Sequence, residues 1–140
     1  MPIDKTLIIK KLDFLNQHLT GVERMDFSEQ SFIGDEDIHD LVTFRLQQAV
    51  ETSIDIATHI IAESDLPRKE TAKDAFLLLG EQGIIDEDLS LRMGKAADFR
   101  NRVVHGYNNF DYSLLFRDYR DNIRDLRQFG ANILKFLKSK

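Results

Sequence analysis

Hydrophobic residues recur at intervals of three and four along most of this chain, which is the spacing of one face of an α-helix. The longest such pattern begins near Gly34 and Asp35 and ends before Pro67, because a residue that precedes proline avoids helical geometry. Its apolar positions are Ile38, Leu41, Val42, Leu46, Ala49, Val50, Ile54, Ala57, Ile60 and Ile61. This stripe predicts one long amphipathic helix.

The same spacing predicts four more helices, separated by short polar or glycine-containing turns. They cover residues from about 4 to 18 or beyond, 71 to 82, 86 to 105 and 113 to 138. In the helix that begins at Asp86, the residues expected to face inward are Leu89, Met93, Ala96, Ala97, Val103 and Val104. The segment TGVERMDFSEQSFIGDED, at residues 20–37, carries a weaker pattern and is expected to be looser before the long helix starts. Without a competing strand pattern, four or five helices predict an all-α, up-and-down bundle in a single domain, residues 1–140.

Composition narrows the chemistry without changing the fold. The chain has no Cys, which excludes disulfides, thiolate metal sites and cysteine catalysis. Its net charge of −5 argues against broad, non-specific nucleic-acid binding but leaves room for a local basic patch. No apolar run has the length of a signal peptide or a membrane span, so we expect a cytoplasmic protein without membrane contact. The acidic segment GDEDIHD is better explained by the positive end of a helix than by a metal ion, and no phosphate-binding loop suggests a cofactor.

The stretch RNRVVHGY, residues 100–107, places two Arg, one His and one Tyr within eight residues at the end of a predicted helix. A helix turns by about 100° per residue, so Arg100 and His105 project about 140° apart, whereas Asn101 shares a face with His105. The two could converge on one ligand if the helix unwinds, if Arg100 reaches round, or if two subunits build the site. A half-buried Arg needs a partner, and either a carboxylate of the same chain or an RNA phosphate would serve. The residues alone leave a polar helix end and a catalytic site both open.

The same stretch matches the pattern R-x4-H-x-Y, and here the chain resembles the HEPN domains. It is most similar to the HepT-like toxins, which accompany a minimal nucleotidyltransferase antitoxin. The segments SIDIATHIIAE at residues 53–63 and DAFLLLGEQGIID at residues 74–86 also resemble that branch, and the likeness runs from about residue 36 to 137.

The resemblance implies the toxin of a type VII toxin–antitoxin system: a homodimeric, metal-independent endoribonuclease without a cofactor. The 2′-OH of RNA would attack the adjacent phosphate while His105 acts as general base or acid. Arg100 would hold the phosphate and stabilise the charge of the transition state, and Asn101 would orient either group. The resemblance further implies that the antitoxin attaches AMP to Tyr107 and so blocks RNA from the cleft.

Two further groups of residues are candidates for supporting roles. Asp55 and His59 lie four apart on a second, polar face of the long helix; they are either a solvated pair or, as the resemblance implies, residues at the border of the dimer cleft. The possible RNA-binding arginines are Arg102, Arg117, Arg120 and Arg124. The last three belong to a stripe that alternates with aspartates, so a solvated ion-pair face is the competing interpretation.

Two other functions stay open at this point. The chain could be a catalytically silent HEPN module that binds a nucleotide or substrate for a partner nucleotidyltransferase, or a plain helical dimer with an adaptor role. The intact Arg100, His105 and Tyr107 favour the ribonuclease, because a silent module has no need to keep all three.

Overall fold

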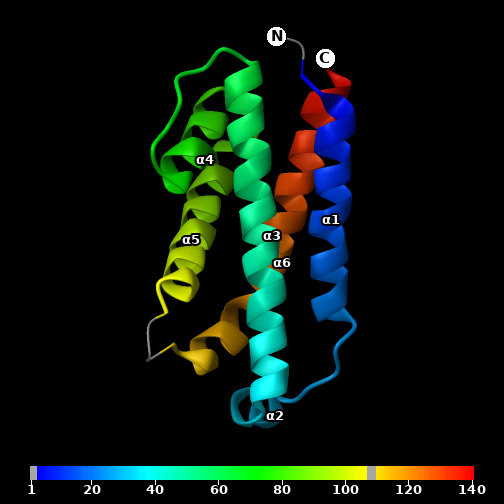
Figure 1. Cartoon of the computed structure of the whole chain (residues 1–140), viewed down its shortest axis with the longest axis vertical. Helices are drawn as coiled ribbons and strands as arrows, with labels where there is room; N and C mark the ends of the chain where they lie inside the picture. The colour runs from blue at the N-terminus through cyan, green and yellow to red at the C-terminus, as the bar shows by residue number, and fades with distance from the viewer. Residues whose placement is uncertain (1–2, 107–109) are drawn as a thin grey trace.

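The computed structural model describes residues 3–106 and 110–140, and every regular element within them is a helix (Figure 1). The helices are α1 (Lys5–Glu23), α2 (Glu29–Gly34), α3 (Glu36–Glu63), α4 (Ala72–Glu81), α5 (Glu87–Val104) and α6 (Tyr112–Lys138). The long helices run alternately up and down, with both chain termini at one end and α2 at the other. The predicted all-α bundle is therefore confirmed.

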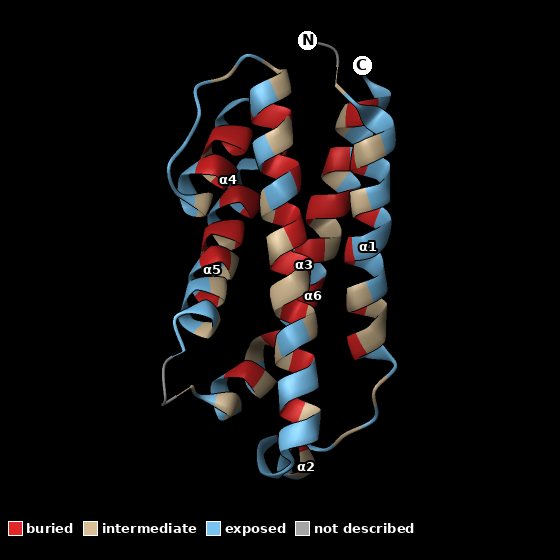
Figure 2. Ribbon diagram, viewed as in Figure 1, coloured by how far each residue is buried: buried red, intermediate tan, exposed pale blue. Residues whose placement is uncertain are grey.

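The bundle closes around a core to which every helix contributes. Fully buried side chains include Phe32, Phe76, Phe129, Ile8, Leu15, Leu19, Leu46, Ile56, Ile60, Leu79, Leu89 and Met93. Figure 2 shows the buried turns along the inward faces of the helices and the exposed residues on their outer faces. No helix of the described chain is long and apolar enough to cross a membrane.

The hydrophobic stripes predict this core well, with two errors. Leu41 on α3 and Val104 on α5 were expected to face inward, yet they are 41% and 52% exposed. Leu41 lies at the edge of its stripe, and Val104 is the last residue of α5.

The segment expected to be looser contains the short helix α2, so this part of the prediction was wrong. Ser28 and Ser31 cap its start reciprocally, and its only buried side chain is Phe32. The ring of Phe32 packs among Phe27, Phe116 and Tyr119, with centroids 5.3, 5.5 and 6.4 Å away. A helix of fewer than two turns is too short to produce a periodic pattern, which explains why the sequence did not reveal it.

Two predicted turn signals lie at the start and the end of α5. Asp86 precedes its first turn, although its carboxylate accepts from the Gln128 side chain rather than from the helix (3.2 Å). At the other end the backbone of Gly106 has φ +64°, a left-handed conformation that favours glycine and stops the helix. The site residues around position 100 thus occupy a well-defined last turn.

Candidate active site

Arg100 projects from α5 toward α3 and lies half-buried between the two helices. Its Nη1 donates to Glu51 Oε1 of α3 at 3.1 Å, and the two side chains are 23% and 38% exposed. The Nε of Arg100 is buried and has no hydrogen-bond partner among the described residues. A guanidinium in this position is costly to leave unpaired, so Glu51 is the carboxylate that holds it in the isolated chain.

The helix stays wound up to the histidine of the motif. The backbone N–H of His105 donates to the carbonyl of Asn101 at 3.1 Å, and His105 is the C-cap residue of α5. Both residues are exposed. Because α5 does not unwind before His105, Arg100 projects from a different face of the helix than Asn101 and His105 do.

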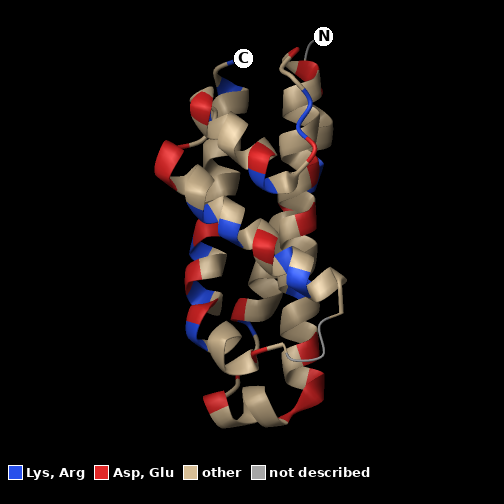
Figure 3. Cartoon of the chain, turned by 90° about the vertical axis from the view of Figure 1, so that its left-hand side faces the viewer, with Lys and Arg blue, Asp and Glu red and all other residues tan. Residues whose placement is uncertain are grey.

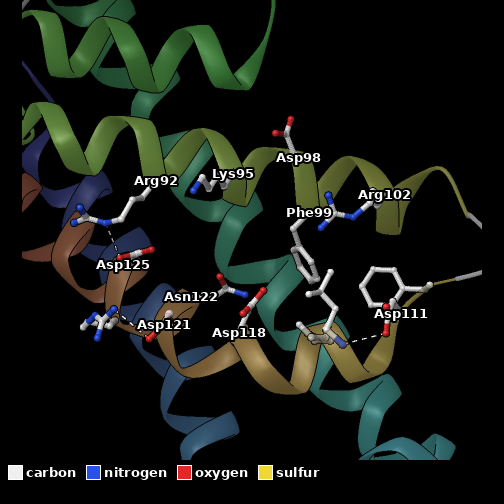
Figure 4. Close-up of a pocket in the computed structure, with 14 residues that line it drawn as sticks. Arg92, Lys95, Asp98, Phe99, Arg102, Asp111, Asp118, Asp121, Asn122 and Asp125 are labelled. Atoms are coloured by element: carbon white, nitrogen blue, oxygen red, sulfur yellow. Dashed lines mark hydrogen bonds and ion pairs between the residues drawn. The ribbon is translucent and has the colours of Figure 1, made fainter.

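Arg102 is exposed and points away from Arg100, into a groove between α5 and α6 (Figure 4). It makes no hydrogen bond or ion pair with the residues that the structure describes. In the last turn of α5, Arg100 therefore faces α3, Asn101 faces solvent and Arg102 faces α6. Tyr107, the predicted modification site, lies outside the described residues.

The predicted supporting pair on α3 is arranged differently from a simple i, i+4 contact. Asp55 is 63% exposed and pairs with Lys11 of α1 at 3.1 Å, while His59 is half-buried. Asp55, Glu51 and Phe14 border the same hollow of about 320 Å³ between α1 and α3. The sequence analysis did not name Glu51 as a candidate site residue, although Glu51 precedes Asp55 by four residues and so lies on the same face of the helix.

The three candidate arginines of α6 form ion pairs or contact aromatic rings within the chain. Arg117 pairs with Asp118 at 3.0 Å and Arg124 with Asp121 at 3.1 Å; Asp118 is half-exposed and the other three are well exposed. The Arg120 guanidinium lies over the rings of Tyr119 and Phe116, 5.0 and 5.7 Å from their centroids. On this side of the molecule basic and acidic residues are interspersed rather than gathered in one basic face (Figure 3). Exposed pairs of this kind are weak, so the arginines could exchange partners, and their role in RNA binding stays a prediction.

An all-helical bundle that presents Arg and His five positions apart at the end of one helix is the arrangement of a HEPN protein. The sequence model described as Ribonuclease HepT-like matches residues 8–133, so the chain belongs to the HepT-like ribonuclease family.

Known relatives agree with this assignment over nearly the whole chain. The mRNA nuclease HepT of Shewanella oneidensis is 27% identical over 123 residues, 88% of this chain and 92% of that protein. The tRNA nuclease HepT of Aphanizomenon flos-aquae is 26% identical over 116 residues, 81% of this chain and 78% of its own length. A solved structure of the tri-AMPylated HEPN toxin of Shewanella oneidensis, in complex with its MNT antitoxin, superposes with a TM-score of 0.83 at 26% identity, covering 95% of this chain and 97% of that one.

Proposed function

We propose that this protein is the toxin of a HEPN/MNT toxin–antitoxin pair and cleaves RNA as a metal-independent endoribonuclease. The observation that carries the proposal is the last turn of α5, where half-buried Arg100 donates to Glu51 alone among the described residues while His105 is exposed at the helix end. The family and the nuclease names of two relatives support the same reaction class.

The reaction needs one proton acceptor, one proton donor and a cation. The 2′-OH of a ribose attacks the neighbouring phosphorus, the bond from phosphorus to the 5′-oxygen breaks, and the products are a cyclic 2′,3′-phosphate and a free 5′-OH. The imidazole of His105 removes the 2′-OH proton or protonates the leaving oxygen. Arg100 binds the non-bridging phosphate oxygens, whose negative charge grows in the transition state.

A second copy of the chain would bring an Arg100 and a His105 together. The face of α1 and α3 next to the Arg100–Glu51 pair exposes Phe14, Leu41 and Phe44, with exposed fractions of 46%, 41% and 50%. Between the two phenylalanines lies His18, 4.5 and 6.2 Å from their ring centroids. Burial and the nearby Arg45 cation lower the pKa of His18, which favours the neutral imidazole between the two rings. An apolar face beside the catalytic turn suits a symmetric dimer in which two motifs share one cleft.

Expression in a host without the antitoxin tests the ribonuclease. Wild type should arrest growth and deplete cellular RNA, whereas Arg100→Ala and His105→Ala should each lower cleavage by at least about a hundredfold, as the loss of a charge stabiliser or an acid–base group does. Asp74→Ala, on the exposed surface of α4, is the control. Folded but inactive wild-type protein would favour a silent module, and toxic variants would show that the site lies elsewhere.

We further propose that the antitoxin, a nucleotidyltransferase, silences the toxin by attaching AMP to Tyr107. Support comes from the relative in Shewanella oneidensis, whose toxin is tri-AMPylated and bound to an MNT antitoxin. An added phosphodiester chain beside His105 would repel RNA by its charge. Co-expression followed by intact-mass measurement should show a gain in multiples of one AMP unit that disappears in Tyr107→Phe. A gain that survives this substitution would move the modification to another residue.

A further inference from the structure

A groove of about 480 Å³ lies between α5 and α6 (Figure 4). Its apolar part is formed by Phe99 and Phe110, whose rings meet edge to face at a centroid distance of 5.9 Å, together with Leu114, which is 39% exposed. A hollow of this size, with an aromatic surface and polar walls, has the dimensions of a small-ligand site.

The wall formed by α5 carries three cations, Arg92, Lys95 and Arg102, and one carboxylate, Asp98. Lys95 and Arg102 are both exposed, and neither makes an ion pair with any described residue. The other two cations at the groove are occupied, since Arg92 pairs with Asp125 at 2.9 Å and Arg124 pairs with Asp121. The groove therefore offers two cations for a phosphate group, both on one wall.

The opposite wall, formed by α6, carries hydrogen-bond acceptors. Asp118 and Asn122 point toward α5, and the Asn122 amide has no hydrogen-bond partner among the described residues (Figure 4). Asp118 accepts from Arg117 at 3.0 Å, and its carboxylate remains half-exposed. Because carboxylates line this wall, a run of phosphates would be repelled, and a ligand with one phosphate and an uncharged, amino-bearing ring suits the groove better.

The groove adjoins the proposed catalytic turn. Arg102 follows Arg100 by two residues and faces α6. Around the axis of α5, the exposed residues Asn101 and His105 project between these two arginines. An α-helix with its side chains is only about 10–12 Å across. A single strand of RNA that crosses the C-terminal end of α5 therefore needs only a few nucleotides to reach from Arg100 to the groove.

We propose that the α5–α6 groove is a base-recognition subsite, which binds one nucleotide of single-stranded RNA near the cleaved bond; this rests on the proposed ribonuclease activity. Lys95 and Arg102 bind its phosphate, and its base packs against Phe110. The amino group of the base donates to Asp118 and Asn122. Asn pairs with adenine and a carboxylate accepts from the cytosine amino group, so adenine or cytosine is preferred over uracil.

Cleavage of a random-sequence RNA pool, with sequencing of the new ends, tests the preference. Wild type should show adenine or cytosine enriched at one fixed distance from the cut. In Asn122→Ala and Asp118→Ala that enrichment should fall by about fivefold or more, the value of a good base contact. Lys95→Ala should raise KM severalfold, while Lys135→Ala, at another exposed lysine on the last turn of α6, should leave it unchanged.

A binding measurement separates failure of the subsite from failure of the proposed activity. In His105→Ala, 5′-AMP and 5′-CMP should shift the NMR signals of the Asn122 side-chain amide, 5′-UMP should shift them less, and Lys95→Ala should weaken all three. Bound AMP at the groove without RNA cleavage by wild type would overturn the ribonuclease but not the nucleotide site. Unchanged base preference together with no shift at Asn122 would overturn the subsite, as would groove variants that impair only antitoxin binding.

Discussion

At the scale of single residues, the chemistry of the site depends on what Arg100 contacts before RNA arrives. Its guanidinium has five N–H donors and Glu51 accepts from one of them, so a phosphate can bind beside the carboxylate. The same carboxylate repels the phosphate. Glu51 therefore has two opposing effects, since it orients Arg100 and lowers its affinity for an anion.

Two substitutions at Glu51 separate these effects. Glu51→Gln keeps an acceptor for Arg100 but removes the charge, so KM for RNA should fall about threefold to tenfold with kcat nearly unchanged. Glu51→Ala removes the acceptor as well, so kcat should fall about tenfold and the free energy of unfolding by about 1 kcal/mol, a modest value because both side chains are partly exposed. The readouts are steady-state cleavage kinetics and urea unfolding.

Asp55→Asn is the matched control for Glu51, because it removes a more exposed carboxylate from the same face of α3. Equal changes in KM for Asp55→Asn and Glu51→Gln would mean that only the overall charge of the surface matters. That result would contradict a specific role for Glu51 at Arg100.

At the scale of helices, the sequence was informative where a pattern repeats over several turns and uninformative where it does not. Most of the stripe predicted for α3 is buried, namely Val42, Leu46, Ala49, Val50, Ala57, Ile60 and Ile61. The helix α2 is too short to produce such a stripe, and Val104 could not be assigned to solvent because its exposure depends on where neighbouring helices end.

The site illustrates the same limit. The motif predicts Arg100 and His105 as site residues from local spacing, and helical geometry correctly indicated that they project from different faces. Glu51 could not be paired with Arg100 from the sequence, because the contact joins residues 49 positions apart and depends on how α3 packs on α5. The α5–α6 groove was missed for the same reason, since its two walls come from different helices.

At the scale of the whole molecule, the splayed arrangement of Arg100 and His105 supports the proposal that each active site combines residues of two subunits. The helix stays wound up to His105, and Glu51 holds Arg100 on the α3 side, so one chain does not aim both groups at one phosphate. A dimer across the face of Phe14, Leu41 and Phe44 would instead place each Arg100 opposite the partner's motif.

Complementation between two inactive variants tests this arrangement directly. When Arg100→Ala and His105→Ala chains are co-expressed with different tags and purified through both, every dimer holds one copy of each. If a site uses Arg100 from one subunit and His105 from the other, one of the two sites is intact, and the mixed dimer should cleave RNA at about half the wild-type rate.

If instead each chain builds its own site, both sites of the mixed dimer lack one residue, and activity should stay at the level of the single variants. Pairing Arg100→Ala with the double variant Arg100→Ala/His105→Ala is the control, because it provides no Arg100 and should stay inactive in either arrangement.

Adding Phe44→Glu to both chains of the active mixture should lower activity together with the dimer fraction measured by analytical ultracentrifugation, because the charge would be buried in the apolar contact. Full activity in a monomeric Phe44→Glu protein would exclude a shared site.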